Sequence, residues 1–300
     1  MDVGQPSLDQ LRVFLTVAEE GSFNRAAQRL GRAISVVSYA IGQLEGQLGV
    51  SLFSREGSRK PQLTPEGQAL LAEARAVAND VDALVAKVRS LQQGLESELS
   101  LAVDVMVPGD AIARILREFQ RMFPTVPLRL HVEALGAVAA LVIDGQADIA
   151  IGGPVAADCP EVERQAIGSV ELIPVAAPSH ALAQMQTIPP GETRKHFQLV
   201  LTDRSPLTAG RDFSVLSPHS WRLADLGAKH VLLREGLGWG NMPRHMILDD
   251  LAKGALVHLD VPEGPRFDFQ LSALWRRDRV PGPAAFWMLS AFQDARLGQP

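Results

Sequence analysis

Near the start of the chain, apolar residues recur at the three- and four-residue steps that place side chains on one face of a helix. Three helices are predicted, and they end at Gly21, Gly31 and Gly49, because glycine readily adopts the left-handed conformation found just beyond a helix. Ser7 and Gln10 form a capping box at the start of the first helix. The predicted inner faces consist of Leu8, Leu11, Phe14, Leu15 and Ala18, then Phe23, Ala26, Ala27 and Leu30, then Ile34, Val37, Ile41, Leu44 and Leu48.

The second and third of these helices, joined by a tight turn, have the layout of a helix-turn-helix. The third carries small and polar residues opposite its apolar face, and such a helix can enter the major groove of DNA. Short strands are predicted at 51–55 and 62–63, which makes a winged helix-turn-helix over residues 1–65. Residues 24–64 include six basic and two acidic side chains, although the net charge of the chain is −5. The positive charge therefore lies where the predicted DNA-reading motif is.

A long helix is predicted to follow the wing. Thr64 caps it, and Pro65 occupies its first position, where a missing amide is harmless. A helix of about 30 residues is roughly 45 Å long, too long to bury its apolar stripe against a small domain. We therefore expect residues 66–96 to form a linker helix that pairs with a second copy, with a core helix of one large domain as the alternative. The stripe consists of Ala69, Leu70, Ala74, Val77, Val81, Leu84, Val88, Leu91 and Leu95.

Beyond the linker, predicted strands and helices alternate, which indicates parallel sheets with right-handed crossovers. The first unit has strands at 99–105, 127–133 and 147–152 and helices at 111–122 and 137–145. A second unit begins at 172–177 and continues with 197–202, 221–223, 224–235 and 248–259, before a strand at 267–275 and a helix at 284–297.

The predicted fold class is therefore a multidomain α/β protein in which residues 97–300 form two lobes. Lobe I spans about 97–167 and 268–300, and lobe II about 168–267. Ligands of such sheets bind outside the carboxyl ends of the strands.

The composition is that of an ordinary soluble globular protein, and no motif for a cofactor is found. Hydrophobic residues make up 46% of the chain and charged residues 21%, as in ordinary globular proteins. The single cysteine, Cys159, excludes an internal disulfide, and neither a leader pattern nor an apolar run of membrane length occurs, so we expect a cytoplasmic protein with no membrane partner. No two of the seven histidines have close metal-ligand spacing, and the glycines at 236, 238 and 240 are not a dinucleotide fingerprint. No metal, cofactor or catalytic residue is expected.

Several short motifs follow one another in a fixed order. They are Gly21–Leu30, Ser38, Gln43-Leu44-Glu45, Leu48-Gly49, Leu52-Phe53-Ser54-Arg55 and Leu63-Thr64-Pro65-Glu66-Gly67, then Asp144-Gly145, Asp148–Gly152 and the glycine-rich Gly236–Pro243. In this order they resemble the LysR-type transcriptional regulators. The resemblance implies a winged helix-turn-helix, a linker helix and a two-lobed α/β effector domain similar to type 2 periplasmic binding proteins. It also implies double-stranded promoter DNA and a small organic effector as partners, and a homodimer or homotetramer.

The resemblance further implies DNA contacts from the third helix and the wing. Residues expected to read the groove and the backbone are Arg32, Ser35, Ser38 and Tyr39. Residues expected to contact phosphates are Arg55, Arg59, Lys60 and the hydroxyl of Thr64. Ala33-Ile34 stands where many members have Ser-Gln, so Ile34 can offer only an apolar contact or face the core, while the Ser38-Tyr39 pair matches a subset of the family.

By position, the resemblance places effector contacts at strand ends in both lobes. The expected residues are Met106 and Pro108 in lobe I, and Thr202, Asp203, Trp221 and Trp239 in lobe II. The glycines around Trp239 are expected to let the backbone approach the ligand. Pro108-Gly109-Asp110 stands where the family often has a hydroxyl residue at a helix start, which argues against a carboxylate bound at that helix.

A function of another class is also compatible with the sequence. The chain can be a small-molecule-binding or hydrolytic α/β protein, with Asp148 or Asp203 acting alongside a distant histidine and an N-terminal domain that only dimerises it.

Overall fold

The computed structural model of the chain describes residues 4–54, 61–92, 94–264, 266–295 and 297. Internal contacts divide the chain into two compact units, Met1–Ser90 and Leu91–Pro300, and each is described by itself. The long helix α4 (Pro65–Gln92) belongs almost wholly to the first unit, whereas we expected a separate linker segment at 66–96.

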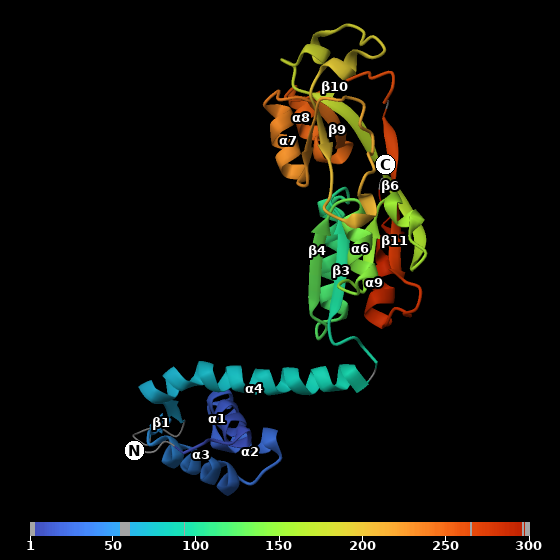
Figure 1. Cartoon of the computed structure of the whole chain (residues 1–300). Coiled ribbons are helices and arrows are strands. Elements are labelled where there is room, and N and C mark those ends of the chain that lie inside the picture. Colours follow the sequence, from blue (N-terminus) through green and yellow to red (C-terminus); the bar gives the residue numbers. More distant parts are fainter. Residues whose placement is uncertain (1–3, 55–60, 93, 265, 296, 298–300) are drawn as a thin grey trace. The chain divides into compact units, whose positions relative to one another are not determined.

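The first unit begins with three helices, α1 (Leu8–Glu20), α2 (Phe23–Leu30) and α3 (Ile34–Leu48) (Figure 1). The capping box is present, because the Ser7 hydroxyl accepts from the Gln10 amide and the Gln10 side chain accepts from the Ser7 amide. The helices end at glycines in the left-handed region, with φ of 55° at Gly21, 63° at Gly31 and 71° at Gly49. The predicted helix boundaries are thus confirmed.

Helix α3 packs its inner face into the core of the first unit. Val37, Ile41 and Leu44 are buried there as predicted. Ile34 was expected on the same face, but 48% of its surface is exposed. The reason is that residues 31–36 are all exposed, so the first turn of α3 extends past the core.

A small wing follows α3. It consists of the antiparallel strands β1 (Phe53–Ser54) and β2 (Gln62–Leu63). The Phe53 ring packs edge-on against Phe14 and Phe23, with centroids 5.7 Å apart in each pair. The Glu45 carboxylate accepts hydrogen bonds from the Leu52 and Phe53 amides, which ties the wing to α3. The wing tip at 55–60 lies outside the described residues.

Helix α4 begins against the wing. The Thr64 hydroxyl accepts a hydrogen bond from the Gly67 amide, as its predicted capping role requires. Gly67 is needed here, because a Cβ would lie 2.2 Å from the Leu52 carbonyl oxygen. Ala74 and Ala78 face the core of the first unit. An apolar face of the helix stays exposed, and it consists of Val77, Leu84, Val85, Val88 and Leu91.

The second unit is built on one mixed sheet with the strand order β4-β3-β5-β11-β6-β9-β7-β8, and β10 also pairs with β6. Its strands are β3 (Leu99–Asp104), β4 (Leu128–Glu133), β5 (Ile149–Gly152), β6 (Val162–Ala176), β7 (Gln198–Leu201), β8 (Ser220–Leu223), β9 (Trp239–Pro243), β10 (Val257–His258) and β11 (Phe267–Arg276). Pairing is parallel within β4-β3-β5 and within β9-β7-β8, and antiparallel where β6 and β11 join these groups.

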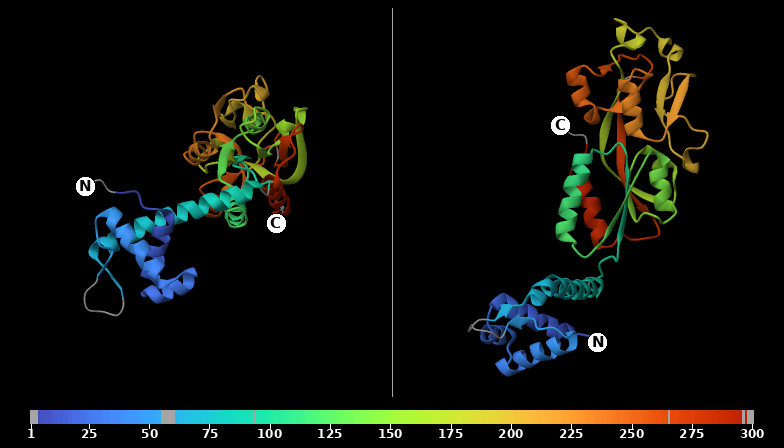
Figure 2. Two further views of the ribbon diagram at one scale, coloured as in Figure 1. Left: turned by 90° about the horizontal axis from the view of Figure 1, so that it is seen from below. Right: turned by 90° about the vertical axis from the view of Figure 1, so that its left-hand side faces the viewer.

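Strands β6 and β11 run through both lobes (Figure 2). Lobe I contains β3, β4 and β5, and lobe II contains β7, β8, β9 and β10. The register of β6 against β11 shifts between Leu271 and Ser272, opposite Gly168. Gly168 has φ of 145°, and a Cβ there would meet the Leu297 carbonyl oxygen at 2.3 Å. The expected lobe boundary at 167/168 falls at this irregularity.

Helices flank the sheet in both lobes. Lobe I has α5 (Gly109–Met122), α6 (Gly136–Ile143) and α9 (Pro283–Asp294), and lobe II has α7 (Leu226–Arg234) and α8 (Leu248–Lys253). The Glu96 carboxylate accepts hydrogen bonds from the Ala284 and Ala285 amides, so it caps α9 at its N-terminus. Most predicted elements are present with shifted ends. The prediction for β6 was wrong, since this strand begins ten residues before the expected strand at 172–177, and the glycine-rich motif includes a strand, Trp239–Pro243, that was not predicted.

Candidate DNA-binding face and interlobe cavity

The outward face of α3 is the candidate DNA-reading surface. Ser35 and Ser38 are exposed, and Tyr39 is 68% exposed. Ile34 lies on this face as well, so its apolar side chain is available for contact outside the core. Gly42 continues the face, with nothing within 4 Å of an added Cβ. The face therefore offers hydroxyls, a phenol and an aliphatic group, the side-chain types that can contact base edges and thymine methyls.

Arg32 stands just before α3 and is already paired. Its guanidinium binds both carboxylate oxygens of Asp9, with N–O distances of 2.8 and 2.7 Å. This bidentate hydrogen bond holds the pKa of the Asp9 carboxyl below its usual range. Arg29 is paired with Glu19 and Glu20 of α1. The arginines of the helix-turn-helix thus bind acids of α1 in this structure.

The wing residues Arg55, Arg59 and Lys60 lie outside the described residues. Thr64 is described, and its hydroxyl is fully engaged in capping. It donates to the Ser51 carbonyl at 2.6 Å and accepts from the Gly67 amide at 2.9 Å. Its hydroxyl hydrogen is therefore unavailable to a phosphate unless the bond to Ser51 breaks.

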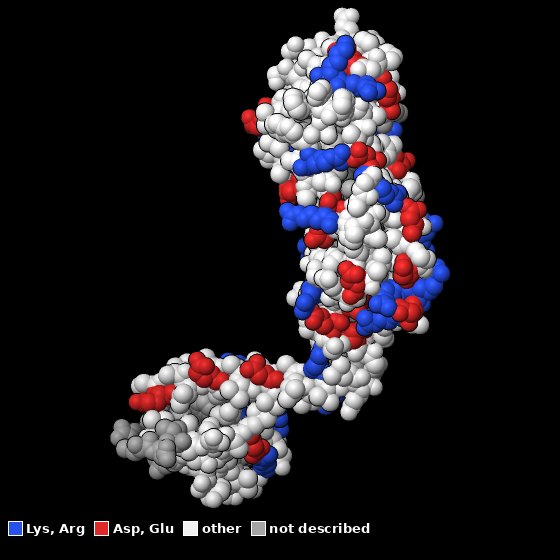
Figure 3. Space-filling model, in the orientation of Figure 1, with Lys and Arg blue, Asp and Glu red and all other residues white. Residues whose placement is uncertain are grey.

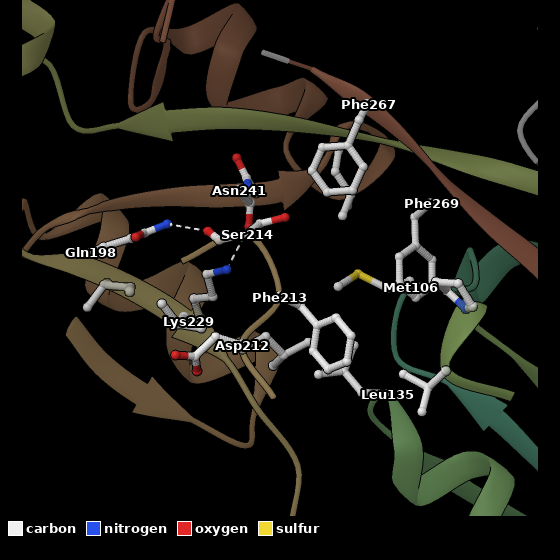
Figure 4. Close-up of a pocket in the computed structure, with 16 residues that line it drawn as sticks. Met106, Leu135, Gln198, Asp212, Phe213, Ser214, Lys229, Asn241, Phe267 and Phe269 are labelled. Atoms are coloured by element: carbon white, nitrogen blue, oxygen red, sulfur yellow. Dashed lines mark hydrogen bonds between the residues drawn. The ribbon is translucent and has the colours of Figure 1, made fainter. Parts of the chain in front are cut away.

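A cavity of about 280 Å³ lies between the two lobes (Figure 4). Lobe I contributes Met106, Leu135, Pro154 and Val155. Strands β6 and β11 contribute Leu172, Phe267 and Phe269. Lobe II contributes Gln198, Leu199, Val200, Leu201, Asp212, Phe213, Ser214, Lys229 and Asn241. The lining is mostly apolar with few polar groups, as in small-molecule sites.

Lys229 is the only lysine or arginine among the described residues that line this cavity. It comes from α7, where Leu226, Lys229 and Leu233 form the buried face, and only 3% of its surface is exposed. The ammonium donates to the Asn241 carbonyl at 2.7 Å. Burial lowers the pKa of Lys229 to about 7. Gly240 leaves room for its stem, since a Cβ there would lie 3.3 Å from Cε of Lys229.

Asp104 ends β3 on the lobe I side of the cavity and is 1% exposed. Its two oxygens accept hydrogen bonds from the Met106 and Leu135 amides, at 3.0 and 3.1 Å. Burial raises the pKa of Asp104 to about 7, although both amide hydrogen bonds act in the opposite direction. Leu135 has φ of 52°, a strained value for a branched residue, and this carboxyl group holds its amide in place.

Of the residues expected to bind the effector, Met106 lines the cavity. Asp203 stands at the junction of the lobes, where it accepts from the Ala137 amide of α6 at 3.1 Å and from the Ser205 amide at 3.0 Å. It also lines a second hollow of about 530 Å³ beside α6. Pro108 directly precedes α5, and Thr202 follows β7. Neither residue lines the interlobe cavity of about 280 Å³.

The two tryptophans lie away from the cavity lining. Trp239 is fully buried in a core cluster with Leu182 and Leu259, so its expected role as a wall of the site is corrected. Trp221 is 45% exposed on β8 and packs against Phe197 with the rings tilted, their centroids 5.7 Å apart. The aromatic walls are instead Phe213, Phe267 and Phe269.

The glycines around Trp239 also have another role than expected. A Cβ on Gly238 would lie 2.7 Å from the Phe197 carbonyl oxygen, and one on Gly240 would lie 2.5 Å from the Leu199 carbonyl oxygen. Both glycines therefore let β9 approach β7. Gly236 has φ of 76° and turns the chain after α7.

Lys229, Asp104 and the three phenylalanines were not predicted as site residues from the sequence. A signal for Lys229 was present, because it stands three residues after Leu226 and four before Leu233, on the inner face of a predicted helix. A lysine on such a face is unusual and marks a candidate site. The phenylalanines gave no comparable signal, since they come from a loop and a strand that are far apart in sequence.

The described residues hold no cluster of three or more His, Cys, Asp and Glu side chains suited to a metal ion. Within the same residues, none of the helices could span a membrane. Asp148 accepts from the Ser100 amide and pairs with Arg279, and Asp203 accepts from the Ala137 and Ser205 amides, so among the described residues neither carboxylate is hydrogen-bonded to a histidine. Cys159 is buried, which raises the pKa of its thiol.

Comparison with known families assigns both units. Residues 8–68 match the family described as bacterial regulatory helix-turn-helix protein, lysR family. Residues 92–296 match the LysR substrate binding domain. Together these matches cover most of the chain.

Relatives match along nearly the whole length. The HTH-type transcriptional regulator AceR of Acinetobacter baumannii is 26% identical, over 96% of this chain and 97% of its own. The HTH-type transcriptional activator AllS of Klebsiella pneumoniae is 30% identical, over 83% of this chain and 93% of its own.

Two solved structures have a similar fold. A mutant of Corynebacterium glutamicum OxyR has a TM-score of 0.54 and 23% identity, covering 97% of this chain and 95% of that one. Full-length LysG of the same organism, with bound effector Arg, has a TM-score of 0.53 and 20% identity, covering 98% of this chain and 100% of that one. From the two family matches and these relatives we conclude that the chain belongs to the LysR family of transcriptional regulators.

Proposed function

We propose that this regulator reads promoter DNA with the exposed face of α3 and responds to a small ligand in the interlobe cavity. The observation that carries the proposal is the cavity itself, an apolar space of about 280 Å³ that is lined from both lobes and from β6 and β11. A ligand there can bias the position of the lobes by its differential affinity for their open and closed states. The cytoplasm, where promoter DNA is accessible, is the proposed location.

On the DNA side, Ser35, Ser38 and Tyr39 are proposed to contact base edges, supported by their exposure on α3. Arg32 joins them by exchanging Asp9 for a phosphate or a base. Exchange is possible because both side chains are exposed and a phosphate offers the guanidinium the same bidentate hydrogen bonds as the carboxylate. The wing residues Arg55, Arg59 and Lys60 are proposed to contact phosphates. Thr64 is proposed to support the wing by capping α4 rather than by contacting DNA through its hydroxyl.

Dimerisation is proposed through the exposed apolar face of α4. Val77, Leu84, Val88 and Leu91 recur at three-, four- and seven-residue steps and are exposed in the single chain. A partner helix laid along this face would cover them. The resulting pair would present two copies of α3 to a two-fold symmetric operator.

The proposed mode of action is binding without catalysis. The support is chemical: the thiol of Cys159 is buried, and the carboxylates of Asp148 and Asp203 are occupied by amides and, for Asp148, by an arginine. A hydrolase would need one of these groups free beside a general base.

The experiment measures operator affinity with and without a panel of small aromatic and aliphatic metabolites. The operator is first selected from fragments of the source genome with the full chain. Wild type is compared with Ser214→Trp, which adds bulk at the cavity, and with Ser179→Trp, a matched change at an exposed serine of lobe II that does not line it. We expect at least one compound to change the operator affinity of wild type and Ser179→Trp but not of Ser214→Trp. An undiminished response in Ser214→Trp would place the effector elsewhere.

A second experiment distinguishes base contacts made by α3 from phosphate contacts made by the wing. Tyr39→Ala should relax base preference by about 1–3 kcal/mol at the contacted position. Lys60→Ala should weaken binding to all sequences alike and reduce the salt slope by about one. Binding to a randomised operator library at several salt concentrations distinguishes the two outcomes. A change of base preference in Lys60→Ala with none in Tyr39→Ala would reverse the proposed roles.

A further inference from the structure

The interlobe cavity contains a buried cation that has no acidic partner among the described residues. The Lys229 ammonium donates one hydrogen bond, to the Asn241 carbonyl, and three N–H groups are available when it is charged. A buried charge is normally paired, because leaving it alone in an apolar surrounding is costly. The unused hydrogen-bonding capacity therefore points to a partner from outside the described chain.

The charged groups around Lys229 are occupied elsewhere. Asp212 lines the same cavity, but its carboxylate pairs with Arg222 at 2.5 Å. Asp104, on the lobe I side, is held by the Met106 and Leu135 amides. The polar Gln198 is engaged as well, since its amide donates to the Ser214 carbonyl and its oxygen accepts from the Leu216 and Ser217 amides.

The rest of the cavity is suited to a compact apolar body. In Figure 4, Lys229 lies on one side, while Phe213, Met106 and Phe269 lie on the other. Phe269 is packed against Gly153, where a Cβ would lie 2.2 Å from its ring, so the position of this wall is fixed. A volume of about 280 Å³ is near the lower limit of small-molecule sites and suits one ring or a short branched chain.

We propose that the ligand of this cavity is a small organic anion, a carboxylate on a compact aromatic or branched aliphatic body, with its negative charge paired to Lys229. The proposal rests on the proposed function, because it assumes that the interlobe cavity is the effector site. The anion is bound by Lys229 of lobe II, and its apolar body by Phe213 of lobe II together with lobe I, β6 and β11, so one ligand contacts both lobes.

The anion-binding group is also distinct from the general surface charge. On the face of Leu91–Pro300 in Figure 3, basic and acidic side chains are interspersed.

Burial lowers the pKa of Lys229 to about 7, so a proton can be taken up when a ligand binds. An anion beside the ammonium favours its charged form, so binding above neutral pH requires uptake of a proton.

The test uses matched acids and neutral amides as probes. Benzoate, phenylacetate and isovalerate are titrated into the full chain by calorimetry at pH 7, alongside benzamide, phenylacetamide and isovaleramide. We expect at least one acid to bind at submillimolar to millimolar concentration, with its amide about tenfold weaker or more, the usual effect of a charge-assisted hydrogen bond.

Variants then assign the preference to one residue. Lys229→Met, which preserves the shape of the side chain, should remove the preference for acid over amide while leaving amide binding unchanged. Lys253→Met is the matched control, because Lys253 is an exposed lysine of α8 whose partner is Asp249, and it should behave as wild type. Thermal unfolding verifies that each variant is folded.

The outcomes distinguish a wrong ligand class from a wrong ligand site. Equal binding of acids and amides, or an acid preference that persists in Lys229→Met, would overturn the anion proposal. If the neutral amides bind in that case and Ser214→Trp blocks them, the cavity remains the ligand site and only the ligand class is wrong. If no acid binds at millimolar concentration, the anion proposal fails. If any bound probe is unaffected by Ser214→Trp, the proposed site itself fails.

Discussion

Each lobe buries one ionisable side chain beside the cavity, but the two are satisfied differently. Asp104 of lobe I receives hydrogen bonds from the Met106 and Leu135 amides. Lys229 of lobe II donates to one carbonyl and otherwise faces the cavity. Burial shifts the pKa of each to about 7, upward for Asp104 and downward for Lys229. A buried group satisfied by the backbone is part of the framework, whereas one that faces open space is available to a ligand.

The largest expected effect comes from removing the framework carboxyl. Asp104→Leu leaves the Met106 and Leu135 amides without partners, and each orphaned amide costs about 1–3 kcal/mol. We expect a total loss of about 3 kcal/mol in the free energy of unfolding, measured by urea denaturation, and a smaller loss for Asp104→Asn, which retains one acceptor. Asp268→Leu, at an exposed position of β11, is the control. Unchanged stability of Asp104→Leu would show that Asp104 is not a framework group.

The opposite sign is expected for the cavity-facing charge. Lys229→Met removes a buried ammonium at the cost of its one hydrogen bond to the Asn241 carbonyl, so it should raise the free energy of unfolding by a net of about 1 kcal/mol near neutral pH. Lys253→Met should change it little. A destabilised Lys229→Met would mean that the lysine supports the fold, and the contrast between the two lobes would then disappear.

The same two groups predict opposite pH dependences. The pKa of Asp104 in the folded chain, about 7, lies above its ordinary value of 3.8. Its stabilising contribution to the free energy of unfolding is therefore full below pH 3.8 and is lost as pH rises to about 7. The folded pKa of Lys229, about 7, lies below its ordinary value of 10.5, so its contribution is full above pH 10.5 and is lost as pH falls to about 7.

Each slope is at most about 1.4 kcal/mol per pH unit. Urea denaturation from pH 4 to pH 10 measures both. In a plot of the free energy of unfolding against pH, Asp104→Asn should flatten only the part below about pH 7. Lys229→Met should flatten only the part above it. If neither variant changes the slope of this plot, the pH dependence of stability arises from other groups.

The smallest effect concerns the contact between the lobes. Asp203 follows β7 of lobe II and accepts from the Ala137 amide in the first turn of α6. Asp203→Ala removes the acceptor of the Ala137 and Ser205 amides and of the Thr208 hydroxyl. Because the side chain is only half-buried, water can replace part of these bonds, so the substitution should lower stability by about 1 kcal/mol and speed hydrogen exchange at the Ala137 amide. Thr202→Ala, a neighbouring change whose described side-chain hydrogen bond is local, is the control. Equal protection of that amide in all three proteins would show that Asp203 does not hold the lobes together.

The first unit could be predicted closely from the sequence because its signals are local. The Ser7–Gln10 box and the glycines at 21, 31 and 49 fix the helix ends by interactions within a few residues. Ile34 was misplaced because periodicity gives the angle of a side chain around its helix but not how far the core extends along it.

The cavity could not be predicted in the same way, because its walls come from separate segments that the sheet brings together. Met106 could be predicted because it directly follows a predicted strand. Phe213 and Phe269 occupy no comparable position in the sequence pattern. Trp239 was assigned to the site because it stands among glycines, yet those glycines serve the pairing of β9 with β7. Local pattern does not distinguish backbone that approaches a ligand from backbone that approaches a strand.

The central claim is that an anion in the interlobe cavity is paired with Lys229. It is tested most directly by counting protons taken up when the tightest-binding carboxylate is titrated at pH 8, in two buffers of different ionisation enthalpy. Because burial lowers the pKa of Lys229 to about 7, wild type should take up a substantial fraction of one proton per site, and Lys229→Met should take up none. No uptake in wild type, or equal uptake in both proteins, would contradict the account.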